Sequence, residues 1–100
     1  MSAEISDERL ERLLTGVKID LGILNSTAYD NRLITYINAA VEEIEREGAS
    51  LAEETVDGNL IIQAYAAWKW RTRSEPGAMP RALRYSINNL VFHQKAKPEE

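Results

Sequence analysis

The chain has 100 residues, no cysteine and a formal net charge of −4. This length predicts one domain with a modest core, and the lack of cysteine excludes a disulfide framework and a thiolate metal site. The first residues, MSAEISDERLERLL, contain no apolar signal core, and no apolar run is long enough to cross a bilayer. The composition suits a reducing compartment, and we expect neither secretion nor membrane insertion.

The first helix is predicted to begin after Ser6, because a serine oxygen can accept a hydrogen bond from a free backbone N–H at a helix start. The helix should end near residues 20–22. Its apolar stripe consists of Leu10, Leu13, Leu14 and Val17. The segment 23–28 is expected to be a loop, in which Ser26 or Thr27 caps the next helix.

The segment from Tyr29 to Glu47 shows the clearest helical period in the chain, and Gly48 fits the position just after its end. One face is apolar at i, i+3 and i+4 spacing, with Leu33, Ile34, Ile37, Ala40, Val41 and Ile44. The last turns carry four acids, Glu42, Glu43, Glu45 and Glu47. Two interpretations of these acids stay open: a solvated surface, or an acidic face for a basic partner or for the wall of a nucleic-acid conduit.

The segment from Asp57 to Arg73 is the most apolar run, and we predict that it forms the central helix with Asp57 as its N-cap. Its two apolar sides are Leu60, Ile61, Ala64 and Trp68 on one, and Ile62, Ala66 and Trp70 on the other. The connection before it is expected to contain a short helical turn at residues 51–54. A helix that is apolar nearly all round is predicted to be buried.

A loop at residues 74–79 should precede a fourth helix, with Pro80 at its first position and its end near Gln94. The sequence therefore predicts an all-α fold, a small single-domain bundle of about four helices around a central apolar helix. This domain spans residues 1–94, and residues 95–100 form a charged flexible tail. The expected core comprises Leu33, Ile34, Ile37, Val41, Ile44, Leu60, Ile61, Ala64, Trp68, Leu83, Ile87 and Leu90.

The sequence offers few residues for chemistry, and we assign no catalytic, cofactor-binding or metal-binding role to any of them. His93 is the single histidine, and one histidine without cysteine does not make a usual zinc site. Neither a dinucleotide-binding nor a phosphate-binding glycine motif occurs. We therefore expect no enzymatic activity, no cofactor and no small-molecule substrate.

DNA binding is the alternative that the sequence leaves open. The polar side of the fourth helix carries Arg81, Arg84, Asn88 and His93, and arginine and asparagine commonly contact guanine and adenine edges. The two tryptophans are interleaved with basic residues, although core packing is the expected role for them. The alternative reading is therefore a small helical, helix-turn-helix-like DNA-binding regulatory protein.

Four segments occur in a recognisable order: DLGI, YDNRLITYINAAVEEIEREG, LIIQAYAAWKWRTR and MPRALRYSINNLVFHQK. In their order and spacing, from about Leu13 to Lys95, they resemble the head–tail connector (adaptor) family of tailed bacteriophages. The resemblance is strongest to the branch found in phages and prophages of Gram-positive bacteria.

The resemblance implies a structural virion protein that forms a homo-oligomeric ring beneath the portal, extends the DNA channel and joins capsid to tail. Its implied partners are further copies of itself, the portal protein, and the next connector, stopper or tail protein, with DNA only as passing cargo. It also implies assembly in the bacterial host cytoplasm and a final location at the head–tail interface of the virion.

Charge is distributed unevenly along the chain. Residues 1–57 hold thirteen acids and five bases, which gives −8, whereas residues 58–100 hold three acids and seven bases, which gives +4. A ring requires two different patches of one subunit to meet. We therefore expect one or more of Glu42, Glu43, Glu45 and Glu47 to face Arg71, Arg73, Arg81 or Arg84 of a neighbouring subunit. Alternatively, the acidic helix end lines the channel. The tail residues Lys95, Lys97 and Pro98 are expected to contact the portal.

Overall fold

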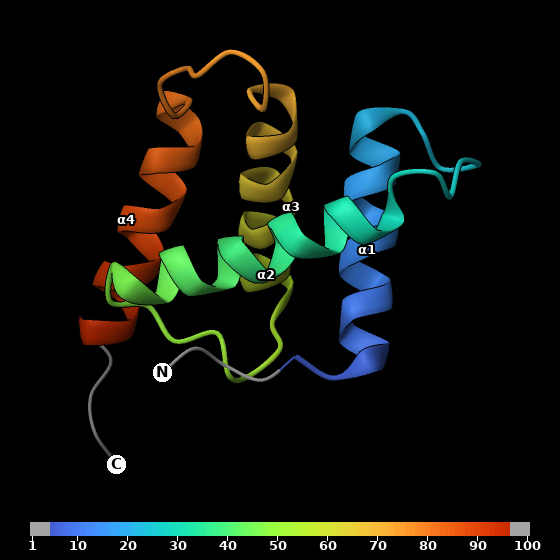
Figure 1. Cartoon of the computed structure of the whole chain (residues 1–100). Helices are drawn as coiled ribbons and strands as arrows, with labels where there is room; N and C mark the ends of the chain where they lie inside the picture. Colours follow the sequence, from blue (N-terminus) through green and yellow to red (C-terminus); the bar gives the residue numbers. More distant parts are fainter. Residues whose placement is uncertain (1–4, 97–100) are drawn as a thin grey trace.

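The structure is a computed structural model, and it describes residues 5–96. This part of the chain forms four helices and no strand, so the predicted all-α fold is confirmed. The helices are α1 (Asp7–Leu21), α2 (Asp30–Arg46), α3 (Val56–Arg71) and α4 (Arg81–Ala96). Helices α1, α3 and α4 lie side by side, and α2 crosses one face of this layer (Figure 1).

Helix α3 is the central element, because it packs against each of the other three helices. Helices α1 and α3 run in the same direction, and α4 runs in the opposite direction (Figure 1). The predicted central position of this apolar segment is therefore confirmed. Because α2 covers only one face of the layer, the opposite face of α3 has no helix over it in the described part of the chain.

The ends of α1 follow the predicted capping chemistry. The Ser6 hydroxyl accepts a hydrogen bond from the Arg9 backbone N–H at 3.1 Å, and Gly22 ends the helix with a φ of 74°. Left-handed backbone of this kind favours glycine, which has no Cβ to clash. Gly48, the residue after the C-cap of α2, likewise has a positive φ of 114°.

Two predicted caps are wrong. Helix α3 begins one residue before Asp57, and its N-cap is Thr55, whose hydroxyl accepts a hydrogen bond from the Gly58 N–H at 2.9 Å. Helix α2 has Tyr29 as its N-cap without a side-chain hydrogen bond, while the Ser26 hydroxyl accepts from the Ala28 N–H within the loop. The predicted helical turn at residues 51–54 is also wrong, since this segment only bends.

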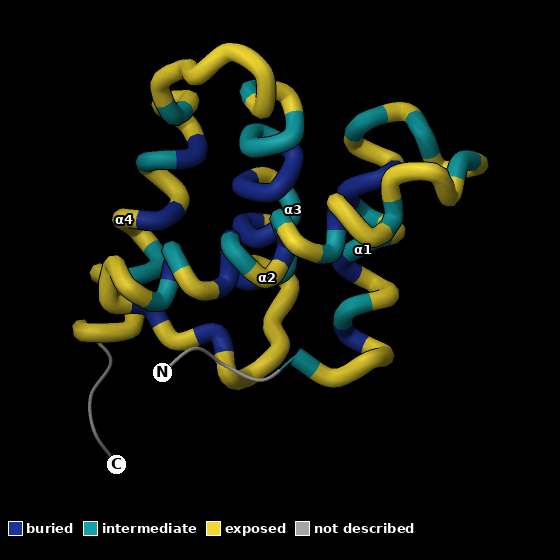
Figure 2. The backbone as a smooth tube through the Cα atoms, viewed as in Figure 1, coloured by how far each residue is buried: buried dark blue, intermediate teal, exposed yellow. Residues whose placement is uncertain are grey.

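The core lies where α2 crosses the layer, and Figure 2 shows most buried positions on α1, α2 and α3. Seven of the twelve predicted core residues are buried: Leu33, Ile37, Val41, Ile44, Ile61, Leu83 and Ile87. Among the side chains that the prediction omitted, Leu13, Val17, Leu51, Ile62 and Tyr65 are also buried. Ile34, Trp68 and Leu90 are only half-buried.

Leu60 and Ala64 are the clear errors in the predicted core, since both are exposed. Leu60 keeps 57% of its surface accessible, and Val56, one turn earlier on the same side of α3, keeps 76%. The physical reason is the single crossing of α2, which covers Ile62 and Ala66 but leaves the other side of α3 open.

A buried arginine joins three parts of the fold. Arg9 on α1 donates to the Leu51 carbonyl at 2.6 Å and to the Asn59 side-chain oxygen at 3.1 Å. These bonds connect the start of α1 to the 47–55 connection and to α3, and they satisfy part of the polar character of this guanidinium. A buried charged side chain of this kind gives no signal in hydrophobic periodicity.

Helix α4 continues through Lys95 and Ala96, so the predicted boundary at residue 94 is two residues too early. In this last part of the helix the Ser50 N–H donates to Gln94 Oε1 at 2.7 Å, and Gln94 Nε2 donates to the Ser50 carbonyl at 2.9 Å. The rest of the predicted tail, including Lys97 and Pro98, lies outside the described residues.

Candidate functional site

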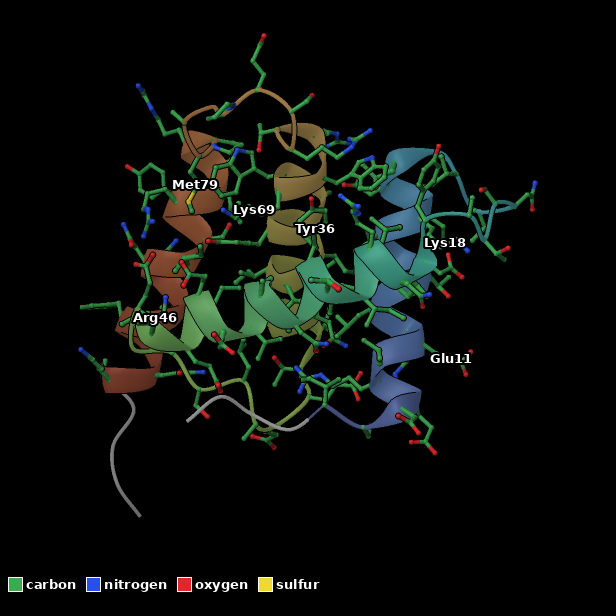
Figure 3. All side chains as sticks on the ribbon, in the orientation of Figure 1. Glu11, Lys18, Tyr36, Arg46, Lys69 and Met79 are labelled. Carbon is green, nitrogen blue, oxygen red and sulfur yellow. The ribbon has the colours of Figure 1, made fainter. Side chains whose placement is uncertain are left out.

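The exposed acids and the bases of the chain gather at different ends of the helical layer. The N-termini of α1 and α3 and the connection between α2 and α3 lie at one end, with the exposed acids Asp7, Glu8, Glu11, Glu53 and Asp57. The C-terminus of α3 and the N-terminus of α4 lie at the other end, with Lys69, Arg71, Arg73 and Arg81. Figure 3 shows the side chains of both groups, with Glu11 labelled on α1 and Lys69 on α3. The named acids and bases lie at opposite ends, while Arg12, paired with Glu54, lies at the first end and Asp20, paired with Arg71, at the second.

Most of the acids that were predicted to meet a neighbouring subunit have partners within the chain. Arg46 forms ion pairs with both Glu42 and Glu43. Glu45 accepts a hydrogen bond from the Leu51 N–H at 2.9 Å. Glu47 accepts two hydrogen bonds from Arg84, at 2.6 and 2.9 Å. This residue pair connects the end of α2 to α4.

The four predicted bases also differ in their surroundings. Arg84 is held by Glu47, and Arg71 donates to the Asp20 carbonyl at 3.1 Å. The Arg73 guanidinium lies 3.6 Å from the centre of the Trp70 ring, a cation–π contact. Arg81 is exposed and takes part in no hydrogen bond or ion pair within the described residues.

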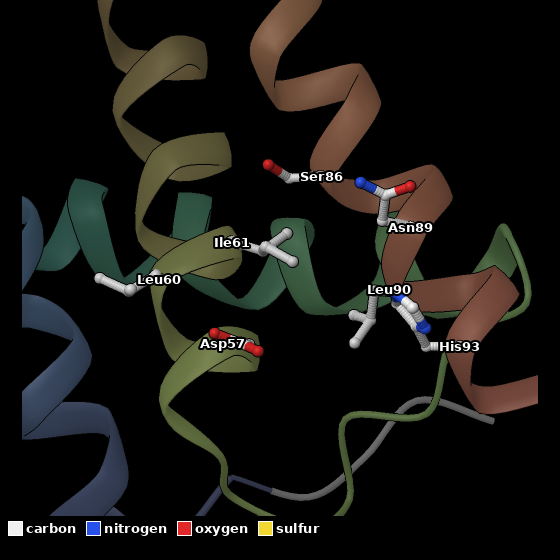
Figure 4. Close-up of a pocket in the computed structure, with 7 residues that line it drawn as sticks. All are labelled: Asp57, Leu60, Ile61, Ser86, Asn89, Leu90 and His93. Carbon is white, nitrogen blue, oxygen red and sulfur yellow. The ribbon is translucent and has the colours of Figure 1, made fainter. Parts of the chain in front are cut away.

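The structure contains a groove on the face of the layer opposite α2, between α3 and α4 (Figure 4). Its lower hollow has a volume of about 440 Å³ and is lined by Asp57, Leu60, Ile61, Ser86, Asn89, Leu90 and His93. An upper hollow of about 380 Å³ shares three of these residues and extends toward the basic end. Figure 4 shows Ile61 and Leu90 between the two helices, with the polar tips of Ser86 and Asn89 on the α4 side.

The upper hollow is more apolar in its residue types than the lower one. Beyond the shared Leu60, Ile61 and Ser86, it is lined by Asp20, Ala64, Trp68, Arg71, Pro80, Ala82 and Leu83. Leu60, Ala64 and Trp68 lie on the side of α3 that the sequence assigned to the core. The groove is therefore the place where part of the predicted core meets solvent.

A second exposed apolar feature lies on α4, and sequence reasoning missed it. Tyr85 and Phe92 keep 66% and 67% of their surfaces accessible, and they share the outer side of α4 with Arg81 and Asn88. We call these four residues the outer stripe. The available signal was the spacing of seven residues between the two aromatic rings, which places them on one side of a helix two turns apart.

The groove offers polar groups but no metal site. Among residues 5–96, no cluster of three or more His, Asp or Glu side chains could hold a metal ion. His93 and Asp57 lie on opposite sides of the lower end of the groove, and no hydrogen bond joins them in the structure. The arrangement of an apolar floor with polar walls is suited to binding an apolar side chain.

The described helices include none that is long and apolar enough to cross a membrane. Comparison with known proteins gives no match: no protein-family model, no curated protein and no solved structure is similar to this chain.

Proposed function

We propose that this chain is the subunit of a head–tail connector (adaptor) ring of a tailed bacteriophage. In this role it sits beneath the portal, extends the DNA channel and joins the capsid to the tail. The proposal originates in the four-segment resemblance, and one structural observation supports it. The central helix exposes an apolar ridge, formed by Val56 and Leu60, on a face that no other helix within residues 5–96 covers.

The exposed ridge favours an assembling protein for an energetic reason. Apolar surface that leaves water at a contact between subunits favours association. A small domain with an uncovered apolar ridge on its central helix, a groove beside it and exposed aromatic rings on α4 gains from self-assembly. The separation of acidic and basic ends further favours contacts between unlike surfaces of identical subunits.

The DNA-binding alternative has less support. Arg84 is one of the polar residues of α4 that were expected to contact bases, and it donates two hydrogen bonds to Glu47. The Trp70 ring packs against Tyr29 and Tyr36 at centroid distances of 5.0 and 6.3 Å, so it is not free to stack on a base. Arg81, Asn88 and His93 remain exposed.

The proposed partners are those of such a ring: further copies of this chain, the portal, and the next connector, stopper or tail protein. DNA is passing cargo, and the chain is assigned neither an enzymatic activity nor a small-molecule substrate. The protein is made in the host cytoplasm and ends in the virion.

The test is to measure the mass of the chain by light scattering, alone and after co-expression with a portal protein of a tailed bacteriophage. A closed oligomer of many subunits, alone or on the portal, is the expected result. A chain that stays monomeric in both conditions, and that binds duplex DNA with a strong salt dependence, would replace this proposal with the DNA-binding alternative.

A further inference from the structure

We propose that the outer stripe of α4 from one copy occupies the groove between α3 and α4 of the next copy. This inference rests on the ring function proposed above and names the surfaces that form the ring contact. The occupant is a second copy of the same chain, bound through a helix in a groove.

The outer stripe has the properties of a helix that docks by its side chains. Arg81, Tyr85, Asn88 and Phe92 follow one another at spacings of four, three and four residues, which keeps them on one side of α4. The buried residues Leu83 and Ile87 face the body of the protein. The two rings therefore stand out from the protein, about 10.5 Å apart along the helix axis at about 1.5 Å per residue.

The groove matches this spacing. Its lining runs along α3 from Asp57 to Arg71, a length of roughly 21 Å by the same rise per residue. The lower hollow and the upper hollow lie one after the other along this length. Two rings separated by half the groove length can each enter one hollow.

The two hollows differ in chemistry as the two rings do. The upper hollow presents Ala64, Trp68 and Leu83, which suit the wholly apolar ring of Phe92. The lower hollow presents Asn89 and His93, which can hydrogen-bond the hydroxyl of Tyr85.

This assignment fixes the direction of the docked helix. With Tyr85 in the lower hollow and Phe92 in the upper one, the docked α4 runs parallel to α3 of its host. Arg81, one turn before Tyr85, then lies at the lower end of the groove, beside Asp57. Both residues are exposed, and neither has an ion pair in the part of the chain that the structure describes. The contact thus brings together an acid and a base that have no ionic partner among residues 5–96.

The stripe and the groove are different surfaces of one subunit. The contact is therefore head to tail, and a docked subunit still presents its own groove to the next copy. This geometry is the one that a ring requires, and a two-fold dimer does not use it.

The first experiment uses charge reversal. Asp57→Arg and Arg81→Asp should each raise the dissociation constant between subunits about tenfold, and the double variant should restore it to within about threefold of the wild type. Glu53→Arg and Arg32→Asp are the controls, because both positions are exposed and lie outside the groove and the stripe. Circular dichroism of each variant establishes that the monomer is folded.

The second experiment uses the absence of native cysteine. Leu60→Cys and Phe92→Cys are purified separately, mixed at concentrations where the wild type assembles, and oxidised. The expected product is a dimer in the mixture, with little dimer from either variant alone, and a ladder of covalent multimers from the double variant. A Leu60→Cys chain that crosslinks to itself as readily as to Phe92→Cys would contradict the head-to-tail contact.

The outcomes separate the inference from the proposed function. Rings that persist in both single charge reversals and yield no mixed disulfide overturn the groove contact and leave the connector function standing. A wild-type chain that stays monomeric alone and with the portal overturns both. If the Leu60→Cys chain forms a crosslink only to the portal, the proposal that a second copy occupies the groove is overturned.

Discussion

Arg84 on α4 and Glu47 at the C-terminus of α2 form a two-bond bridge within one subunit, with N–O distances of 2.6 and 2.9 Å. The hydrogen bonds from Arg84 lower the pKa of Glu47, and those to Glu47 raise the pKa of Arg84. From the sequence, Glu47 and Arg84 are among the residues predicted to face each other between neighbouring subunits. The bridge instead helps to hold α4 against the body of the protein, and Arg81 and Lys95 are the bases of α4 without an ion pair among the described residues.

Arg84→Ala is therefore expected to lower the free energy of unfolding by up to about 1 kcal/mol, because the bridge is partly exposed and solvent screens it. Arg81→Ala should change the same quantity by less than about 0.5 kcal/mol. Urea unfolding followed by circular dichroism measures both. Equal losses in the two variants would show that the bridge does not stabilise the subunit.

The acid stability of the protein should depend on Glu54. The Glu54 carboxylate accepts bonds from Arg12 at 2.6 and 2.9 Å and from Asn59 at 2.7 Å, and these bonds lower its pKa from 4.5 to about 2, Arg12 contributing most. A carboxylate with a lowered pKa in the folded state stabilises that state above its unfolded pKa and loses this contribution as the pH falls through the folded value.

Glu54→Gln should therefore have a lower urea midpoint than the wild type at neutral pH, and the difference should shrink between pH 4.5 and about 2. The control is Glu53→Gln at the neighbouring exposed position, which should leave the midpoint at neutral pH nearly unchanged. A Glu54→Gln difference that stays constant down to pH 2 would contradict the assignment.

The sequence predicts the helices well where one apolar phase runs through a segment. Helix α2 is the example: Leu33, Ile37, Val41 and Ile44 were expected in the core, and all four are buried. The predicted end of α1 at residues 20–22 is also confirmed, because Gly22 supplies the left-handed residue that a helix end requires.

The side of α3 that meets solvent could not be predicted in the same way. Its apolar residues surround the helix, so periodicity contains no information on which side the other helices leave open. The error at Leu60 and Ala64 follows directly from this. These two residues line the groove, because apolar side chains that suit a core remain uncovered there in the single subunit.

Charge counting cannot identify the charges that are free for an interface, for a different reason. A sum over residues does not distinguish a carboxylate that is paired within the chain from one that is free for a partner. The cluster from Glu42 to Glu47 supplies four of the acids, and Arg46 and Arg84 pair with three of them. The tertiary contacts, which the sequence does not display, decide which charges remain for a neighbour.

The burial difference along α3 gives a direct mutational test. Ile62→Ala should lower the free energy of unfolding by about 2–5 kcal/mol, because Ile62 is fully buried and its loss leaves a cavity. Leu60→Ala, two residues earlier, should cost less than about 1 kcal/mol in the monomer, since most of this side chain is already in water. The measurement is urea unfolding at concentrations low enough to keep the protein monomeric. Similar losses at both positions would contradict the uncovered ridge.

Two glycines in helices should respond differently to alanine. A Cβ at Gly16 would meet the end of the Gln63 side chain at 2.3–2.5 Å, and this flexible, half-buried amide can rotate away. Gly16→Ala should then raise the free energy of unfolding by up to about 1 kcal/mol through helix propensity. A Cβ at Gly58 would instead lie 2.9 Å from the Thr55 hydroxyl that caps α3.

Gly58→Ala should therefore show no gain in the thermal unfolding midpoint, because the new methyl displaces the capping hydroxyl and offsets the better helix propensity. Comparing the two midpoints tests the packing around both positions. A gain at Gly58 equal to that at Gly16 would mean that the cap contributes little.

The start of α3 provides the last test, because it separates two residues that the sequence confused. Thr55→Ala should cost about 1 kcal/mol, since the Gly58 N–H loses the hydroxyl that accepts its hydrogen bond at 2.9 Å. Asp57→Asn should cost only a few tenths of a kcal/mol, because Asp57 is an exposed first-turn acid that acts on the helix dipole alone. Urea unfolding of the two variants at low concentration measures the order. A larger loss at Asp57 would make it a folding residue, and its charge reversal would then no longer report on the contact between subunits alone.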